Sequence, residues 1–233
     1  MFVKRKQNIW KKLLNLLSLQ TQNCKVCFEE IKDKSFHHFF NNTTICCKCL
    51  AKFRPKFKEF MFEGVKVLSI YEYKDSIKEK LFLFKGCFDY ELYSVFLNIY
   101  ENELRIKYKG FYVVFVPSTD ESDRIRGFNH VKEMFKFLNL PSLDLLRKVG
   151  NDKQAKSTYL ERKKIGKHIV LNKKVNLINK KILIVDDVIT TGATLRASIN
   201  LIKSLKPKRI EILTMAKREF DYSLGGKNID VIK

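Results

Sequence analysis

The chain has 233 residues, of which 45% are hydrophobic and 19 are Phe, and its 46 Lys and Arg against 25 Asp and Glu give a formal net charge of +21. This composition excludes a disordered chain, and no apolar run approaches the roughly 20 residues that a membrane-spanning helix requires. The length suits a domain of about 150 residues beside a small module. Basic residues spread along the whole chain favour a polyanionic partner, nucleic acid first. The alternative is the composition bias of an AT-rich genome combined with a site for a polyphosphate.

Residues 1–22 form a basic amphipathic segment that carries Trp10 and several leucines. Asn15 and Ser18 interrupt its apolar stretch, and no small-residue cleavage site follows, so the pattern is not that of a signal peptide. We predict a short helix that packs on the protein, with contact to a membrane surface as the alternative.

Residues 23–63 are predicted to form a zinc-binding module. Two C-x-x-C pairs separated by 18 residues have the spacing of a four-thiolate zinc site. The predicted ligands are Cys24, Cys27, Cys46 and Cys49. Cys47 could replace Cys46, although this gives a poorer spacing, and a pair of disulfides is the other alternative, which no sign of an oxidising compartment supports. Zinc would supply the stability that so short a segment cannot obtain from a hydrophobic core.

Cations alternate with aromatic rings after the second cysteine pair. The cations are Lys48, Lys52, Arg54, Lys56 and Lys58, and the rings are Phe53, Phe57 and Phe60. A surface for single-stranded nucleic acid needs cations for the phosphates and rings on which bases stack. The same pattern is also typical of a domain seam whose aromatic residues point inward, and the sequence leaves both interpretations open.

Residues 64–233 are predicted to form an α/β domain, because strand and helix patterns alternate along them. The expected strands are 65–73 and 111–116, and the expected helices are 77–84, 89–104 and 130–138. Cys87 lies in an apolar stretch and is expected in the core. A polar loop before residue 130 contains Arg126 and Gly127, which we predict to be a second anion site. The alternative for this loop is a surface turn with solvated arginines.

The stretch 182–194 is the most informative part of the chain. Residues 182–185 are apolar and predict a strand buried on both faces, while 193–205 has helical spacing. Residues 186–194 therefore lie at the carboxyl end of a parallel strand, where α/β folds bind ligands. The hydroxyls and backbone amides that suit a phosphate monoester come from Thr190, Thr191, Gly192, Ala193 and Thr194.

Two adjacent acids, Asp186 and Asp187, precede this turn. They would repel a phosphate, but they can accept hydrogen bonds from sugar hydroxyls, with a divalent cation offsetting their charge. The alternative is a turn whose polar residues only cap a helix, although capping needs one such residue. The chain contains no P-loop sequence.

This stretch resembles the loop of type I phosphoribosyltransferases that binds 5-phosphoribosyl 1-pyrophosphate (PRPP). The resemblance implies that Asp186 and Asp187 hold the ribose diol, that Thr190 to Thr194 hold the 5-phosphate, and that Mg²⁺ accompanies PRPP. Arg126 and Gly127 would then lie at the pyrophosphate loop.

A longer ordered set of motifs resembles the ComF (ComFC) family of bacterial competence proteins, from about residue 24 to residue 216. The set comprises the two cysteine pairs, Lys85-Gly86, Val116-Pro117, Arg126 to Asn129, Arg147 with Gln154 and Arg162, and the Asp186 to Thr194 loop. Two positions depart from it: His130 stands where the family usually carries Gln, and Ser118-Thr119 where a second Val-Pro-like unit is common.

The resemblance implies a type I phosphoribosyltransferase-like core, a parallel sheet flanked by helices, with a small N-terminal zinc-binding module. It implies a cytoplasmic protein, associated with the inner face of the membrane, that handles incoming single-stranded DNA during natural transformation together with other competence proteins. Residues 148–167, with Gln154, Ser157 and Arg162, correspond to a mobile flap.

Two alternatives remain at this point. One is an active transferase that moves ribose 5-phosphate from PRPP to an amine or base. No residue in the sequence stands out as a catalytic base, and 217–233 is short for a hood that reads a base. The other is a zinc-ribbon regulator of transcription, which leaves the two acids unexplained.

Overall fold

The computed structural model describes residues 22–32, 43–149, 169–173 and 175–218. The predicted N-terminal helix, the flap residues Gln154, Ser157 and Arg162, and the last residues of the chain lie outside these ranges.

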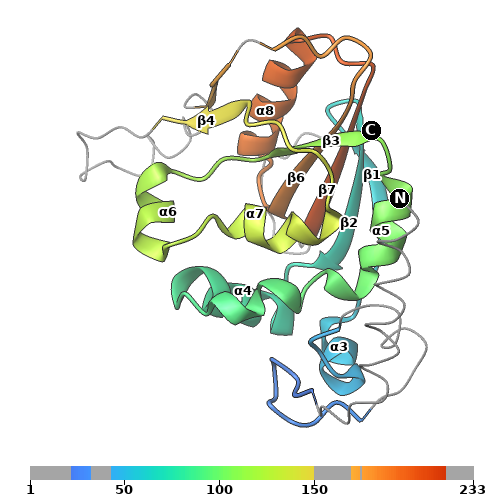
Figure 1. Cartoon of the computed structure of the whole chain (residues 1–233), viewed down its shortest axis with the longest axis vertical. Helices are drawn as coiled ribbons and strands as arrows, with labels where there is room; N and C mark the ends of the chain where they lie inside the picture. Colours follow the sequence, from blue (N-terminus) through green and yellow to red (C-terminus); the bar gives the residue numbers. More distant parts are fainter. Residues whose placement is uncertain (1–21, 33–42, 150–168, 174, 219–233) are drawn as a thin grey trace, which may run out of the picture.

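The centre of the molecule is a five-stranded sheet with the strand order β1-β2-β7-β6-β3 (Figure 1). Its strands are β1 (Lys58–Phe62), β2 (Val65–Glu72), β3 (Phe111–Phe115), β6 (Lys181–Ile189) and β7 (Arg209–Lys217). Neighbours among β2, β7, β6 and β3 run parallel, and only β1 runs antiparallel, to β2. The predicted α/β fold is therefore confirmed, and the carboxyl ends of four parallel strands meet at one edge of the sheet.

Strand β6 lies between β7 and β3, and its side chains pack on both faces of the sheet. Ile182 and Ile184 belong to one hydrophobic cluster, Leu183 and Val185 to the other, and all four are fully buried. Helix α8 (Ala193–Ser204) covers the first face, whereas α4 (Asp75–Gly86), α5 (Glu101–Lys107) and α7 (His130–Phe135) cover the second. The continuous apolar run thus has the two-sided burial that its sequence predicts.

The predicted helix 89–104 is broken into shorter pieces. It consists of two 3₁₀ turns, η1 (Tyr90–Ser94) and η2 (Asn98–Tyr100), followed by α5. Residues 95–97, 99 and 100 are all buried, which is more than one face of a single helix can place in a core. The predicted helix 130–138 likewise changes from α7 to the 3₁₀ turn η3 (Lys136–Leu138).

Part of the predicted polar loop before residue 130 is helical. Helix α6 (Asp120–Arg126) begins after Thr119, whose side chain accepts a hydrogen bond from the amide of Ser122, and it ends at Gly127 with φ 82°. A capping hydroxyl and a left-handed glycine thus bound a helix that has no buried residue and hence no apolar pattern. A small second sheet, β4 (Leu146–Lys148) with β5 (Ile169–Leu171), lies near α6.

The cysteine module packs on the same hydrophobic cluster as the large sheet. Helix α3 (Cys47–Phe53) lies at the opposite end of the molecule from α8 (Figure 1). Phe53 is buried, with its ring stacked on Phe96 and edge-on to Tyr71. Phe53 therefore lies in the contact between the cysteine module and the sheet, as the domain-seam interpretation predicts, and its ring is not exposed for base stacking.

The structure corrects two expectations. Residues 58–62 form β1 and pair with β2, so a boundary after residue 63 falls in a hairpin turn inside the large sheet. Cys87 is exposed instead of lying in the core, because the chain turns away at the end of α4, where the Cys87 amide caps the Leu83 carbonyl.

Candidate functional site

The two acids lie within β6 near its carboxyl end, because the strand continues past Val185 to Ile189. Asp186 is half-buried, and Asp187 is 6% exposed. Each carboxylate accepts a hydrogen bond from the next backbone amide: the Asp187 amide donates to Asp186 Oδ1 at 2.9 Å, and the Val188 amide donates to Asp187 Oδ1 at 2.7 Å. The predicted acid pair thus lies, with both carboxylates hydrogen-bonded, at the edge of the sheet where the parallel strands end.

Asp187 links β6 to α4 through an ion pair and to α7 through a hydrogen bond. Its Oδ2 lies 2.5 Å from Lys85 Nζ and 3.2 Å from His130 Nε2. Both carboxylate oxygens of Asp187 therefore have donors within the protein.

These surroundings separate the two acids electrostatically. Burial by itself raises the pKa of Asp187, but the charge of Lys85 and the hydrogen bond from His130 outweigh it and bring that pKa below its usual range. Burial, followed by the negative charge of Asp187, raises the pKa of Asp186 above its ordinary value. Asp187 is the ionised partner, and Asp186 is the acid that takes up a proton more readily.

His130 donates to Asp187 as a neutral ring. Burial lowers the pKa of His130, although its contact with Asp187 acts in the opposite direction. Arg126 Nη1 lies 3.0 Å from His130 Nδ1, and a guanidinium can only donate. His130 Nδ1 must therefore be the acceptor, which places the ring proton on Nε2, facing Asp187.

Arg126 anchors this network. Its side chain is 9% exposed and donates to Asp123 Oδ1 at 3.1 Å and to the Lys85 carbonyl at 3.2 Å, in addition to His130. The structure therefore brings Arg126 close to the acid pair, but its guanidinium is bonded to protein groups. Gly127, its neighbour in the predicted anion loop, ends α6. A direct contact of these two residues with pyrophosphate stays a prediction.

The hydroxyl-rich turn follows β6 and leads into α8. Thr190 and Thr191 are exposed, and Gly192 adopts φ 70° as the N-cap of α8. A Cβ on Gly192 would lie 2.4 Å from the ring of Phe62, so the turn rests directly on the β1–β2 hairpin. The same hairpin binds α8 through Glu63, whose carboxylate accepts from Arg196 Nε at 2.6 Å.

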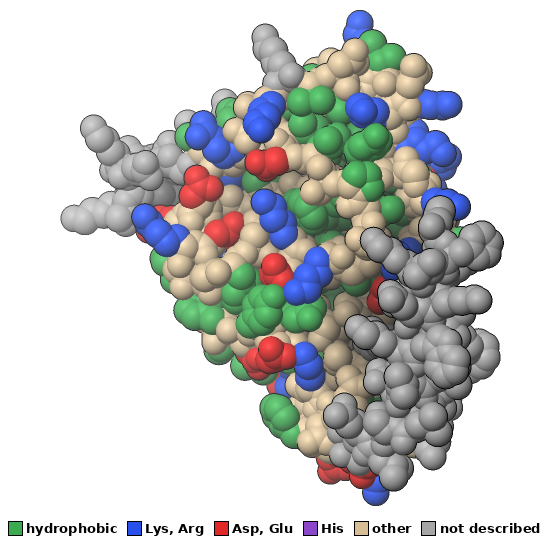
Figure 2. Space-filling view, in the orientation of Figure 1, with side chains coloured by type: hydrophobic (Ala, Val, Ile, Leu, Met, Phe, Trp, Pro, Cys, Tyr) green, Lys and Arg blue, Asp and Glu red, His purple; other side chains and the backbone are tan. Residues whose placement is uncertain are grey.

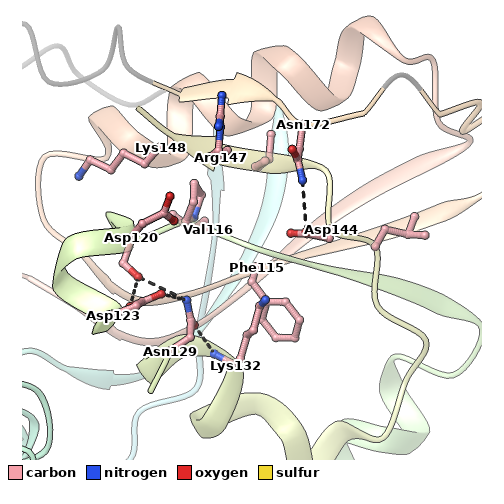
Figure 3. Close-up of a pocket in the computed structure, with 14 residues that line it drawn as sticks. Phe115, Val116, Asp120, Asp123, Asn129, Lys132, Asp144, Arg147, Lys148 and Asn172 are labelled. Atoms are coloured by element: carbon pink, nitrogen blue, oxygen red, sulfur yellow. Dashed lines mark hydrogen bonds between the residues drawn. The ribbon is translucent and has the colours of Figure 1, made fainter. Parts of the chain in front are cut away.

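A pocket of about 240 Å³ lies beside this site, at the carboxyl end of β3 (Figure 3). The amide of Val116 donates to the Val185 carbonyl at 3.0 Å, which places the pocket next to β6. Asp123 is held in its wall by Ser118 Oγ and by Asn129 Nδ2. Its polar lining residues include Asp120, Asp123, Asn129, Lys132, Asp144, Arg147, Lys148 and Asn172.

The four predicted cysteine ligands come together. The sulfurs of Cys24, Cys27, Cys46 and Cys49 all lie within 4.8 Å of one another, whereas Cys47 is exposed. Cys24 Sγ accepts hydrogen bonds from the amides of Val26 at 3.4 Å and Cys46 at 3.3 Å. Burial raises the pKa of Cys24, but these bonds outweigh it and lower the pKa to about 7. Three of the four cysteines are buried and Cys27 is exposed. A cluster of four sulfurs with a stabilised thiolate could hold a metal ion, and its donor set fits zinc.

The predicted nucleic-acid cations are all exposed, namely Lys48, Lys52, Arg54, Lys56 and Lys58. Their neighbouring rings face the protein to differing degrees: Phe53 is buried, and Phe57 is 44% exposed with its ring 4.8 Å from that of Tyr100. Figure 2 shows Lys and Arg scattered over one face, with acidic side chains among them. On that face the positive charge is not gathered into a single stripe.

The sequence did not predict Lys85 and His130 as site residues. Lys85 stood out only as part of a family motif, and His130 only as a departure from the family pattern. Lys85 lies 102 positions from the acid it pairs with. The one available signal is the adjacency of two acids at a strand end, which requires a nearby cation without saying which one.

Comparison with known proteins adds the family. Residues 126–225 match the family described as phosphoribosyl transferase domain. The competence protein ComFC of Streptococcus pneumoniae is 29% identical to this chain, over 66% of this chain and 69% of its own length. The ComFC of Bacillus subtilis is 33% identical, over 54% of this chain and 53% of its own length. These matches support a ComFC-family protein. It has a phosphoribosyltransferase-like domain, and its match spans about half of the Bacillus ComFC.

Among solved structures, a hypoxanthine phosphoribosyltransferase from Staphylococcus aureus is 19% identical to this chain, with a TM-score of 0.34. The match covers 63% of this chain and 69% of the transferase chain. A likeness of this size carries no argument about function. Within the described ranges, none of the helices has the length and apolar character needed to cross a bilayer.

Gly192→Ala tests whether the turn depends on its contact with Phe62. Gly110, with φ 83° and no atom within 4 Å of the place that a Cβ would occupy, is the matched control. Both substitutions incur the left-handed backbone penalty of about 1–2 kcal/mol. Gly192→Ala should lower the free energy of unfolding by about 1–3 kcal/mol more, because its methyl group overpacks against Phe62. Equal losses for the two variants in denaturant unfolding would show that the contact is unimportant.

Proposed function

We propose that this chain handles incoming single-stranded DNA during natural transformation and binds PRPP at the carboxyl end of β6. The observation that carries the proposal is an acid pair followed by a phosphate-type turn, in a chain of the ComFC family. The family relationship supports a location in the cytoplasm, at the inner face of the membrane, where the chain would act together with other competence proteins.

The PRPP site uses the turn and the acids for different parts of the ligand. The exposed hydroxyls of Thr190 and Thr191 and the first amides of α8 suit the 5-phosphate, with Ala193 and Thr194 completing the turn. Asp186 is the freer acid for a ribose hydroxyl, since Asp187 already has a donor at each oxygen. The carboxylate oxygens are ligands that Mg²⁺ prefers, so the acid pair fits an ion bound together with PRPP.

The DNA surface is supported by the five exposed cations after the second cysteine pair and by the net charge of +21. They lie on and just after α3, within a module that zinc would stabilise through Cys24, Cys27, Cys46 and Cys49. We therefore propose that the metal is structural and that the surrounding lysines contact phosphates.

A second candidate function is phosphoribosyl transfer to an amine or base. The pocket beside β3 favours it, because it adjoins β6 and offers both donors and acceptors for a polar acceptor. Lys132 and Asp144 could bind a carbonyl and an amino group, respectively. Turnover of PRPP with a candidate acceptor, lost in Lys132→Met, would distinguish this function from PRPP sensing.

Asp186→Asn combined with Asp187→Asn should weaken PRPP binding about tenfold or more, because charge-assisted hydrogen bonds to the ribose are lost. Isothermal titration calorimetry with Mg²⁺ measures the affinity, and circular dichroism checks the fold. Asp89→Asn, an exposed acid outside the site, is the control and should leave affinity unchanged. Unchanged affinity in the double variant would remove the proposed PRPP site.

Single-stranded DNA binding should weaken steeply with salt, with a slope of about −0.7 per phosphate contact in a plot of log affinity against log salt. A variant with Gln at Lys48, Lys52, Arg54 and Lys56 should have a shallower slope. The control carries Gln at four other exposed lysines, Lys109, Lys173, Lys206 and Lys208, and loses the same charge. Fluorescence anisotropy at several salt concentrations measures both, and equal slopes would contradict a localised surface.

Metal analysis of the purified chain should give one zinc per molecule. Cys46→Ser should lose the zinc and destabilise the protein, because four-thiolate coordination is broken. Cys47→Ser is the matched control, since Cys47 is its neighbour but is exposed, and it should retain the metal. The opposite pattern would make Cys47 the ligand.

A further inference from the structure

We propose that Lys85 is a built-in cation that competes with a divalent metal ion for Asp187. This inference deepens the proposed PRPP site, because it concerns how strongly that site depends on the metal. It rests on the ion pair between α4 and β6, which joins parts of the chain 102 residues apart.

The geometry places the ammonium where it can be exchanged. The Lys85 side chain is 34% exposed, whereas that of Asp187 is 9% exposed, so the lysine reaches a buried carboxylate from the solvent side. Its backbone is fixed, since its carbonyl accepts a hydrogen bond from Arg126 Nε at 3.2 Å. A fixed backbone with a long, partly solvated side chain can release Asp187 by a change of rotamer, without movement of α4.

The charges around the acid pair determine how strongly it attracts a divalent ion. Asp186 and Asp187 offer two carboxylates, and Lys85 supplies one positive charge against them, while His130 is held neutral between Arg126 and Asp187. A divalent ion that approaches the pair is repelled by the ammonium and finds Asp187 Oδ2 already bonded to two donors. Removing the ammonium should strengthen the attraction of the acids for the ion.

The test measures Mn²⁺ binding to the zinc-loaded full chain by electron paramagnetic resonance of free Mn²⁺, with no PRPP present. Mn²⁺ stands in for Mg²⁺ because both prefer oxygen ligands. Lys85→Met should bind Mn²⁺ about tenfold more tightly than the unmodified chain, because the competing charge is gone. Lys78→Met removes the same charge from an exposed position on the same helix, and it should change the affinity little. Equal affinities in Lys85→Met and Lys78→Met would overturn the proposal.

Lys85→Met leaves Asp187 without its cation, so this variant is expected to be less stable than the unmodified chain. Thermal unfolding with and without Mn²⁺ tests the competition in that case. Mn²⁺ should then raise the unfolding temperature of Lys85→Met by more than that of the unmodified chain. An equal or smaller rise would refute the competition. Lys85→Arg retains the positive charge and should keep the Mn²⁺ affinity of the unmodified chain.

A PRPP titration of the same variants separates this inference from the proposed function. If no variant binds PRPP but the Mn²⁺ contrast persists, the proposed PRPP site fails and the role of Lys85 stands. If PRPP binds and the Mn²⁺ contrast is missing, the role of Lys85 fails and the PRPP site stands.

Discussion

The need to compensate the buried charge of Asp187 shapes this end of the molecule. An isolated carboxylate loses several kcal/mol of hydration when it is buried, so its position at the end of a central strand requires donors from other elements. Lys85 from α4 and His130 from α7 supply them, and Arg126 from α6 fixes both. One buried charge thus ties three helices to the edge of the sheet where the ligand would bind.

The phosphate-type turn depends on a different set of contacts. Gly192 rests on Phe62, and Glu63 binds Arg196 in the first turn of α8, so the β1–β2 hairpin holds the turn from the side of the antiparallel edge strand. The acids and the turn are adjacent in sequence, but helices support the acids, whereas the hairpin at the antiparallel edge of the sheet supports the turn. This division explains how Asp187 can serve as an anchor while Asp186 and the turn remain open to a ligand.

The cysteine module is continuous with the core. Cys24, Ile45 and Phe53 belong to the same hydrophobic cluster as the strands, and the ring of Phe53 stacks on Phe96. A metal held by the four sulfurs would therefore stabilise a module that already has an apolar contact with the sheet. The cations on and just after α3 stay at the surface, whereas Phe53 at the end of α3 forms the contact with the core.

Local sequence determined the buried strand β6, the acid pair, the turn before α8 and the cysteine cluster, because each depends on residue types at short fixed spacings. Strand alternation, helix spacing and C-x-x-C pairs are properties of neighbouring residues, and the structure retains them. Only the tertiary structure decided that Lys85 and His130 accompany Asp187, that β1 joins the large sheet, and that Cys87 is exposed. These features depend on packing between segments far apart in the chain, and no local periodicity encodes which distant cation reaches a buried carboxylate.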